Sequence, residues 1–380
     1  MSRKIWLTIL IGGLVLLAFM IISVLLQRDL PKPTGPFSVG RTSRLWVDSS
    51  RPEGLTDNPN DFREVPVEIW YPAQAGTGAK APYFPDLDHL AQTLVDSGEV
   101  DAIEVWGLPL IQSQEFLDAQ IARDSDAYPV IIFSPGNGTN VEFYATIADE
   151  LASHGTIVVG INHPYDVAAV ALSDETVAQF KSGPFEFQAN EAWVQERMVV
   201  RTLDVLFVLS QLEKTNSTPE DFFAGRFDLE QIGMAGHSMG GITASQACLA
   251  DGRLDACLNM DGLQRGGPFS ASEDMTPPNQ PFMMITKEKE FVPTIMEQFK
   301  AIPSGSYRVV INEATHENFT DGPVLLPSIL PTPNEADGIL ALVRAYTLAF
   351  FDQTLKQQRS GLLEQPLQNP QVILEVYPAH

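Results

Sequence analysis

The segment GMAGHSMGG, residues 233–241, places Ser238 between two glycines in the pattern G-x-S-x-G. A serine hydroxyl becomes a nucleophile when a neighbouring base takes its proton, and backbone N–H groups then stabilise the oxyanion that forms. The same five-residue pattern also arises by chance, and Ser238 would then be an ordinary serine in a loop of small residues. The elements around Ser238 and the presence of partner residues decide between these interpretations.

Strand and helix patterns on either side of Ser238 favour the nucleophile. DLEQIGMAG, residues 228–236, predicts a strand, and residues 239–250 predict a helix. A G-x-S-x-G sequence between a strand and a helix is a nucleophile elbow, in which the glycines avoid collisions across a sharp turn. The serine then lies at the helix N-terminus, where the helix dipole favours a developing negative charge.

The general base is expected to follow Ser238, because the chain order in this arrangement is serine, acid, histidine. Of the six histidines, His316 and His380 follow Ser238. His380 is the final residue, where chain ends fray, whereas His316 lies in NEATHENF, directly after the predicted strand SYRVVIN at 306–312. We predict that His316 is the base; the alternative is an exposed loop histidine.

Two carboxylates are candidates for the acid that orients His316. Asp261 lies at the carboxyl end of the predicted strand RLDACLNMDG, residues 253–262, and Glu288 follows the next predicted strand, PFMMIT, residues 281–286. Position favours Asp261, whose alternative role is that of a capping or turn aspartate. The acid holds the histidine tautomer and stabilises the imidazolium.

Two backbone N–H groups are expected to hold the oxyanion. One belongs to Met239, the residue after the nucleophile. The other belongs to Asn137, in the turn PGNGTN after the predicted strand YPVIIFSPG at 128–136. Gly136 and Gly138 let the backbone of this turn approach a substrate. The alternative is an ordinary Pro-Gly turn.

The elements that position these residues alternate along the chain. Short apolar or alternating runs predict strands at 65–73, 128–136, 156–164, 228–236, 253–262, 281–286 and 306–312, and helical patterns fall at 141–154, 195–213, 239–250 and 335–355, the last as a closing helix. Residues 86–123 carry apolar residues at mixed helical spacing. The alternation predicts an α/β fold with a mostly parallel central sheet and helices on both faces.

Residues 165–194 interrupt this alternation with small, acidic and aromatic residues. Two interpretations stay open for this stretch. Phe185, Phe187 and Trp193 would shape an acyl pocket or a lid in one of them. In the other, the segment is a packed surface excursion.

The N-terminus carries an uncharged apolar run at residues 5–26, long enough to cross a bilayer as a helix. We predict a signal anchor over 1–27, a stalk and entry loop over 28–60, and a catalytic domain over 61–380. The catalytic domain is then membrane-anchored and extracytoplasmic. A cleaved signal peptide, which would release a secreted protein, is the alternative.

Composition excludes some functions. The formal net charge of −24 over 380 residues argues against nucleic-acid partners and against electrostatic docking on anionic lipid. No C-x-x-C pair or histidine cluster suggests a metal, and the chemistry above needs no cofactor. Cys248 and Cys257 are expected at the end of one helix and inside the next strand, either as a disulfide or as two buried thiols. The oligomeric state is not predicted.

The segments FSPGNG, GHSMGG, DGRLDACLNMDG and HENFTD occur together in this order. In this respect the sequence resembles the platelet-activating factor acetylhydrolase group of α/β-hydrolases, the plasma and intracellular type II kind and their bacterial relatives, over roughly residues 60–355. The most specific element is His-x-x-Phe-x-Asp, formed by His316, Phe319 and Asp321. Pro135 departs from the histidine of the mammalian members, and Gly262 follows the acid where they have a bulkier stretch.

The resemblance implies the α/β-hydrolase fold, Asp261 as the acid, and oxyanion roles for Asn137 and Met239. It also implies a serine esterase that cleaves short or oxidised acyl chains from phospholipids without a cofactor. A lipase, cutinase or polyester hydrolase is the alternative within the same chemistry. A non-enzymatic binding module, tethered to the membrane through the N-terminal helix, is the alternative outside it.

Overall fold

The computed structural model describes residues 30–85, 87–96, 98, 108–173, 176–181, 191–262, 278–287, 293–326, 336–364 and 370–379. Its strands are β1 (Ser38–Pro52), β2 (Phe62–Ala73), β3 (Ala79–Pro82), β4 (Gln112–Leu117), β5 (Tyr128–Ser134), β6 (Ile157–Ile161), β7 (Ala169–Ala171), β8 (Val177–Gln179), β9 (Phe227–His237), β10 (Ala256–Met260), β11 (Phe282–Thr286), β12 (Ser306–Ile311) and β13 (Val372–Tyr377). Its helices are α2 (Leu87–Asp96), α4 (Ala145–Ser153), α5 (Glu191–Asn216), α6 (Met239–Ala250), α7 (Pro293–Lys300), α8 (Gly322–Leu325), α9 (Ala336–Thr354) and α10 (Gly361–Glu364), with short 3-10 turns η1 (Leu108–Leu110), η2 (Val141–Tyr144) and η3 (His316–Phe319).

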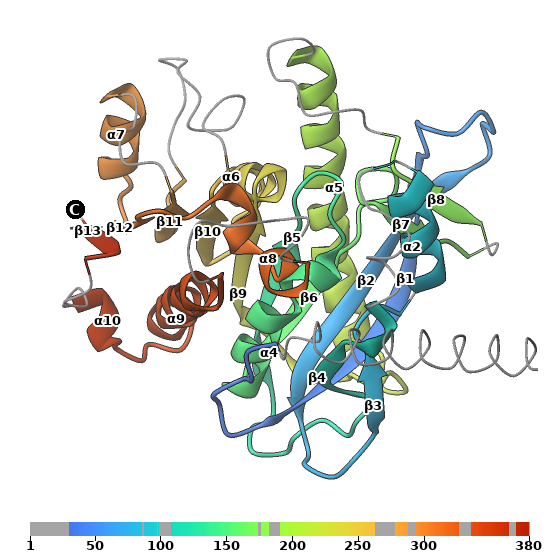
Figure 1. Cartoon of the computed structure of the whole chain (residues 1–380), viewed down its shortest axis with the longest axis horizontal. Coiled ribbons are helices and arrows are strands. Elements are labelled where there is room, and N and C mark those ends of the chain that lie inside the picture. The colour runs from blue at the N-terminus through green and yellow to red at the C-terminus, as the bar shows by residue number, and fades with distance from the viewer. Residues whose placement is uncertain are drawn as a thin grey trace, which may run out of the picture.

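The described strands form an eleven-stranded sheet in the order β13-β12-β11-β10-β9-β5-β6-β2-β1-β4-β3 (Figure 1). The run from β12 to β6 is parallel throughout, and β2 and β13 flank it as antiparallel neighbours. The strands of this run are short, apolar and almost wholly buried, as expected for strands covered on both faces. The predicted mixed α/β fold with a mostly parallel sheet is confirmed.

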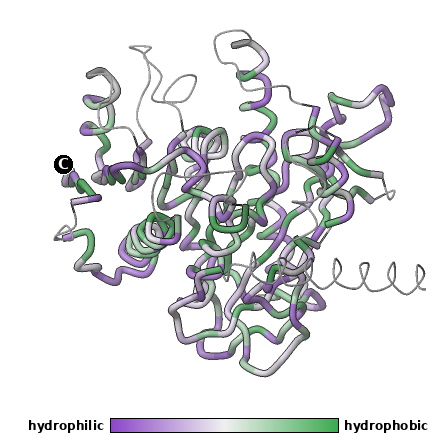
Figure 2. The backbone as a smooth tube through the Cα atoms, viewed as in Figure 1, coloured by the Kyte–Doolittle hydropathy of each residue, from purple (hydrophilic) through white to green (hydrophobic). Residues whose placement is uncertain are grey.

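Helices cover both faces of the sheet, and each face has its own apolar cluster. Helices α4 and α9 contribute to the cluster that contains Trp70, Val158 and Leu258. Helices α5 and α6 contribute to the other, which contains Val159, Met234 and Cys257. Apolar residues gather in the middle of the molecule, and hydrophilic residues dominate the outer loops (Figure 2).

The stalk and entry loop predicted over 28–60 is wrong for Ser38–Pro52, which forms the long strand β1 paired with β2. Charged residues within β1 interrupt the apolar pattern by which a strand is predicted from sequence. Arg41 is fully buried there, and the carboxylates of Glu68 and Glu115 lie 3.4 and 3.7 Å from its guanidinium. Because partners distant in sequence neutralise this charge, its burial is not visible in the local pattern.

Two further differences lie toward the two ends of the sheet. The region 86–123 contains the predicted helical segment as α2, but also the strand β4, which pairs with β1 and β3. The predicted helix at 335–355 is α9, but the chain does not close with it. Strand β13 follows and pairs antiparallel with β12. Strand β4 (QSQEFL) carries polar side chains and lacks the apolar signature of the central strands. The edge strand β13 (VILEVY) is mostly apolar in sequence, but several of its side chains are exposed.

The interrupted segment after β6 forms a small hairpin from β7 and β8. Trp193 lies in the first turn of α5 and packs against Val194, Met198, Met239 and Ile242. Phe185 and Phe187 lie outside the described residues, so the lid interpretation stays a prediction.

Two predictions concern the N-terminus and the cysteines. The apolar run 5–26 lies outside the described residues, and within those that are described no helix has the length and hydropathy needed to span a bilayer. Cys248 on α6 and Cys257 on β10 form a disulfide, which decides between the two alternatives for them.

Candidate active site

Ser238 sits on a strained turn between β9 and α6, with φ 55° and ψ −122°. The flanking glycines are required by close backbone contacts. A Cβ built on Gly236 would lie 2.2 Å from the carbonyl oxygen of Gly240, and one on Gly240 would lie 1.9 Å from that of Ser134. No side chain fits at these separations, so the G-x-S-x-G spacing has the steric origin expected of a nucleophile elbow.

Ser238, His316 and Asp261 are within hydrogen-bond distance in series. The Nε2 atom of His316 lies 2.8 Å from the Oγ of Ser238, and its Nδ1 lies 2.6 Å from Oδ2 of Asp261. Since an ionised carboxylate only accepts, Nδ1–H donates to Asp261 and the Ser238 hydroxyl donates to Nε2. The imidazole is therefore in the tautomer that can remove the serine proton.

Sheet topology explains how residues so distant in sequence meet. Strands β9, β10 and β12 are parallel, and their carboxyl ends lie at the same edge of the sheet. Ser238 follows β9, Asp261 follows β10 and His316 follows β12. The N–H of Ser238 also donates to the carbonyl of Met260 at 2.8 Å, which fixes the elbow against β10.

Asp261 is held in place by donors from β11. Its Oδ1 accepts hydrogen bonds from the Thr286 hydroxyl at 3.0 Å and from the Lys287 N–H at 3.2 Å, which leaves Oδ2 for His316. Asp261 adopts φ 47°, a second non-glycine residue of the site in the left-handed region. The rival acid, Glu288, lies outside the described residues.

The segment that carries His316 is fastened to α4 by Asp321. Oδ2 of Asp321 accepts from the Tyr83 hydroxyl at 2.6 Å and from the Thr146 N–H at 3.1 Å, and the Thr146 hydroxyl donates to Oδ1. The N–H of Asp321 donates to the carbonyl of Phe143 at 2.7 Å. Burial raises the pKa of Asp321 to about 6. The last residue of the His-x-x-Phe-x-Asp element therefore has a positioning role for the loop of His316.

His237 and Phe319 form the aromatic surroundings of His316. The rings of His237 and His316 are 4.5 Å apart between centroids, and Phe319 stacks on His237 with an angle of 14° between the ring planes. Burial, together with the neighbouring His316, lowers the pKa of His237 well below its usual value. His237 is therefore neutral and adds no charge beside the imidazolium that forms during catalysis.

The Pro135–Gly136 peptide, at the start of the predicted oxyanion turn, is held at both ends. Arg201 donates to the carbonyl of Pro135 at 2.8 Å, and the Gly136 N–H donates to the hydroxyl of Tyr144 at 3.0 Å. That hydroxyl in turn donates to Nδ1 of His237 at 2.9 Å. A Cβ built on Gly136 would lie 3.5 Å from the Cβ of Ser238, so the turn lies directly against the nucleophile.

Asn137 is the next residue of this turn. The Gly138 N–H donates to the carbonyl of Asp166 at 2.7 Å, which fixes the far side of the turn. Within the described part of the chain, neither the N–H nor the side chain of Asn137 has a hydrogen-bond partner, and its Oδ1 is buried. Met239 begins α6 and is fully buried, with its N–H at the first helical position beside Ser238.

A second serine–histidine–aspartate series, which sequence reasoning missed, lies beneath the turn. Nε2 of His163 is 2.9 Å from the Ser134 Oγ, and its Nδ1 is 2.8 Å from Oδ2 of Asp204. All three side chains are fully buried, so no substrate reaches Ser134. Burial lowers the pKa of His163 to about 4, and the Arg63–Asp204 ion pair at 2.7 Å completes a structural network.

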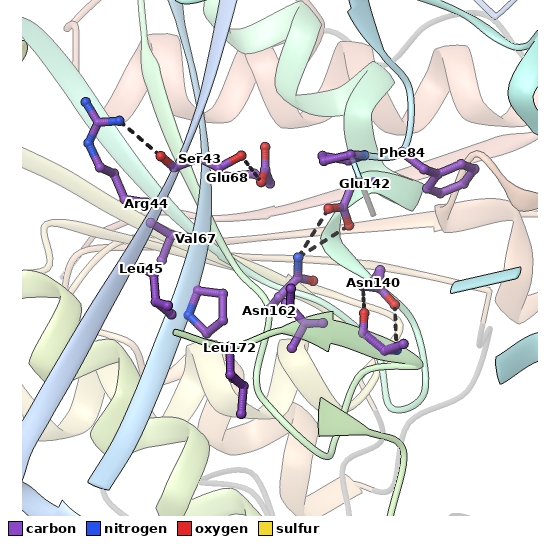
Figure 3. Close-up of a pocket in the computed structure, with 15 residues that line it drawn as sticks. Ser43, Arg44, Leu45, Val67, Glu68, Phe84, Asn140, Glu142, Asn162 and Leu172 are labelled. Carbon is purple, nitrogen blue, oxygen red and sulfur yellow. Dashed lines mark hydrogen bonds between the residues drawn. The ribbon is translucent and has the colours of Figure 1, made fainter. Parts of the chain in front are cut away.

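A pocket of about 330 Å³ lies over β1, β2 and β7, next to Asn162 at the end of β6, and sequence reasoning missed it too. Figure 3 shows it between the Glu142 carboxylate, the Asn162 amide and the side chains of Leu45 and Leu172. The polar residues that line the pocket are dispersed over the chain from β1 to the end of β6, so no short sequence motif predicts the pocket. Among the described residues, no group of His, Cys, Asp or Glu side chains is arranged to hold a metal ion.

A serine on a strand–helix turn, followed in the chain by an acid and a histidine at neighbouring strand ends, defines the class of serine ester hydrolases. Comparison with known proteins narrows the class. The chain belongs to the family described as platelet-activating factor acetylhydrolase, isoform II, whose profile matches residues 22–358. The resemblance seen in the sequence is thus confirmed, and the match extends upstream to include β1.

Individual relatives are distant in sequence, and the matches cover most of each chain. A probable 1-alkyl-2-acetylglycerophosphocholine esterase of Arthroderma benhamiae is 24% identical, over 89% of this chain and 91% of the relative. A platelet-activating factor acetylhydrolase of Cavia porcellus is 25% identical, over 77% of this chain and 69% of the relative. Both names are those of carboxylic ester hydrolases, and this chain is an enzyme of that kind.

One solved structure shares the fold. A ferulic acid esterase from Streptomyces cinnamoneus superimposes with a TM-score of 0.73, covering 91% of this chain and 99% of that chain at 22% identity. At this identity the likeness concerns the fold alone.

Proposed function

We propose that the chain hydrolyses short or oxidised acyl esters of glycerophospholipids through an acyl-enzyme on Ser238. The observation that carries this proposal is the series of distances that links Ser238 to His316 and His316 to Asp261. The left-handed elbow and its glycines support it. We also assign the domain to the α/β-hydrolase fold, on the basis of the parallel sheet and the elbow between β9 and α6.

In this mechanism His316 takes the Ser238 proton as the hydroxyl oxygen attacks the ester carbonyl. Asp261 keeps the imidazole oriented and stabilises the imidazolium. The N–H groups of Asn137 and Met239 donate to the oxyanion of the tetrahedral intermediate. His316 then protonates the leaving alkoxide, and a water molecule activated by His316 releases the acyl group from Ser238.

The substrate class rests on the names of the relatives, which specify acetyl esters of an ether glycerophosphocholine. Within the same chemistry, a lipase, cutinase or polyester hydrolase would prefer long chains or insoluble polymers. The alternative of a binding module without activity is set aside, because the chain belongs to a family of ester hydrolases.

A rate profile over phosphatidylcholines with acyl chains of increasing length at the second glycerol carbon tests the proposal. We expect kcat/KM to fall steeply beyond short acyl groups and to recover for an oxidised chain that ends in a polar group. Preference for long unmodified chains, or for insoluble polyester over every phospholipid, would contradict it.

We further propose that residues 5–26 anchor the catalytic domain on the extracytoplasmic side of a membrane. The length of the apolar run supports the anchor, and the Cys248–Cys257 disulfide supports an oxidising compartment. Fractionation of cells that express the full chain and a chain without residues 1–29 tests this. We expect the full chain in the membrane fraction and accessible to external protease. Recovery of a shortened chain in the medium would favour a cleaved signal peptide instead.

A further inference from the structure

The hairpin of β7 and β8 packs against the oxyanion turn beside the active site. In addition to the hydrogen bond from the Gly138 N–H, the side-chain amide of Asn140 donates to the carbonyl of Ala169 at 2.7 Å and accepts from its N–H at 3.4 Å. The N–H of Phe180 donates to the carbonyl of Ala168 at 2.9 Å, which closes the base of the hairpin. The hairpin is therefore attached to the segment of the turn at more than one point.

Phe180 lies directly on this turn. The end of its ring is 3.7 Å from the position that a Cβ on Gly138 would occupy. At the preceding glycine of the turn, a Cβ on Gly136 would lie 3.5 Å from the Cβ of Ser238. Asn137, whose N–H is the proposed oxyanion donor, thus lies between a residue that contacts the nucleophile and a residue that contacts the Phe180 ring.

The Phe180 ring is not part of the core. It is half-buried, and among the described residues it belongs to none of the four apolar clusters. Trp193, by contrast, packs against the cluster that contains the buried side chain of Met239. A ring left partly exposed over the oxyanion turn offers an apolar surface to a substrate, as aromatic side chains do in binding sites for small molecules.

Buried ion pairs hold the hairpin and the turn in one arrangement. Asp166, at the base of the hairpin, accepts two hydrogen bonds at 2.9 Å from the guanidinium of Arg197 and one at 3.2 Å from that of Arg201. Arg201 also donates to the carbonyl of Pro135 at 2.8 Å, and all three side chains of the network are buried. Because bidentate pairs of this kind have a defined geometry, the backbone that carries Phe180 is fixed relative to the oxyanion turn.

The strand order places Phe180 on the acyl side of Ser238. His316 follows β12, whereas the hairpin follows β6, and these two strands lie on opposite sides of β9 in the sheet (Figure 1). His316 protonates the leaving alkoxide in the proposed mechanism, so the alcohol part of the ester lies on the side of His316. The acyl chain then extends in the other direction, toward β6 and the hairpin that follows it.

We propose that Phe180 limits the length of the acyl chain. This inference rests on the proposed esterase function and names a specificity-determining residue for it. An acyl chain with its carbonyl oxygen on the Asn137 N–H meets the Phe180 ring after a few methylene groups. A longer chain turns at the ring toward the solvent. An oxidised chain with a polar end is stable there, whereas an apolar chain exposes its methylene groups to water.

Water-soluble p-nitrophenyl esters of increasing acyl length, from acetate to octanoate, test the proposal. We expect the ratio of kcat/KM for the hexanoate to that for the acetate to rise about tenfold in Phe180→Ala, because the space of the ring then accommodates additional methylene groups. Phe180→Trp keeps an aromatic ring over the turn and enlarges it. This second variant should lower the ratio of the butyrate to the acetate.

Phe222→Ala is the matched control. Phe222 is also a partly exposed phenylalanine, but it precedes β9 and therefore lies at the end of the parallel strands opposite Ser238. Its ring packs edge-on against that of Tyr71, with 5.5 Å between the centroids. Both ratios should keep their wild-type values in this variant.

A second series varies the alcohol part of the ester, to which a wall on the acyl side does not respond. The ratio of kcat/KM for hexyl acetate to that for ethyl acetate should be the same in the wild type and in Phe180→Ala. A change in this alcohol ratio without a change in the acyl ratio would overturn the proposal. So would a larger rise of the acyl ratio in Trp193→Ala than in Phe180→Ala.

The same measurements separate this proposal from the proposed function. A wild type that prefers short acyl groups, with the same preference in Phe180→Ala, would overturn the role of Phe180 and leave the esterase function in place. The expected shift of the acyl ratio in Phe180→Ala, with no hydrolysis of any phospholipid by the wild type, would support the role of Phe180 and refute the phospholipid substrate.

Discussion

Two residues of the site, Ser238 and Asp261, adopt left-handed backbone conformations that residues other than glycine rarely adopt. Each such conformation costs on the order of 1 kcal/mol or more, and it persists because surrounding contacts fix it. The N–H of Ser238 bonds to Met260 on β10, and the N–H of Asp261 bonds to Ile285 on β11, both at 2.8 Å. The nucleophile and its acid are thus fixed through the parallel strands that carry them.

Tyr144 acts through the oxyanion turn, since its hydroxyl accepts from the Gly136 N–H and donates to His237. Tyr144→Phe leaves both groups without a partner in a buried site. We expect a loss of about 1–3 kcal/mol in the free energy of unfolding, the usual cost of an unsatisfied buried group. We also expect kcat to fall about tenfold with KM little changed, because the oxyanion contact is made in the transition state.

Tyr71→Phe is the matched control for stability. Its hydroxyl is buried and donates to the carbonyl of Ala119 at 2.9 Å, at a position that lines neither the active site nor the pocket. It should lose comparable stability and keep kcat. Affinity for a trifluoromethyl ketone, which forms an oxyanion adduct, should fall with kcat in Tyr144→Phe. A shift in the pH profile with unchanged affinity for this analogue would place the effect on His316 instead.

Among the elements, η3 and α8 are fastened to α4 by one buried carboxyl. The pKa of Asp321 is raised to about 6 by burial, above its value of about 3.9 in an unfolded chain. The fold therefore favours the protonated form. The stability that this preference contributes is present below about pH 4 and is lost as the pH rises through 6.

Asp321→Asn removes this titration. The stability advantage of the wild type over Asp321→Asn should shrink by about 2 kcal/mol between pH 4 and pH 7. Chemical denaturation of both proteins across this range measures the difference. A difference independent of pH would show that Asp321 is ionised at all these pH values in the folded state.

The sequence predicted the central strands because β5, β6, β9, β10, β11 and β12 are nearly all apolar or end in a recognisable motif. It did not predict β1, whose buried Arg41 finds its carboxylate partners on β2 and β4. Charge compensation between distant segments leaves no local pattern. Strand β13 was not predicted either, although its sequence VILEVY is mostly apolar; it is an edge strand with exposed side chains on both faces.

At the scale of the whole molecule, the active-site residues are held by hydrogen bonds from residues that lie far away in the sequence. The Tyr83 hydroxyl reaches Asp321 across 238 positions of sequence, and the Arg201 guanidinium reaches Pro135 across 66. The sequence placed Ser238, His316, Asp261 and Asn137, since each follows a strand that ends at the same sheet edge. The residues that hold these four in place could be identified only from the three-dimensional packing. The catalytic roles themselves stay predictions.

The disulfide ties together the two elements that carry the nucleophile and its acid, α6 and β10. For the short loop that it closes, a disulfide contributes about 3 kcal/mol by restricting the unfolded chain. The Cys248→Ala, Cys257→Ala double variant should lose about that much stability. Its kcat, measured well below the unfolding midpoint, should remain near that of the wild type. If dithiothreitol left the unfolding midpoint of the wild type unchanged, the stabilising role of the disulfide would be contradicted.

The central claim is that Ser238 is the nucleophile, and labelling with a fluorophosphonate tests it most directly. The account predicts a single adduct, located on Ser238 by mass spectrometry of the wild type. It also predicts that Ser238→Ala is not labelled and that its kcat on an acetyl ester is at least about a thousandfold lower, with the fold intact. An adduct on Ser134 or another serine, or activity retained by Ser238→Ala, would contradict the account.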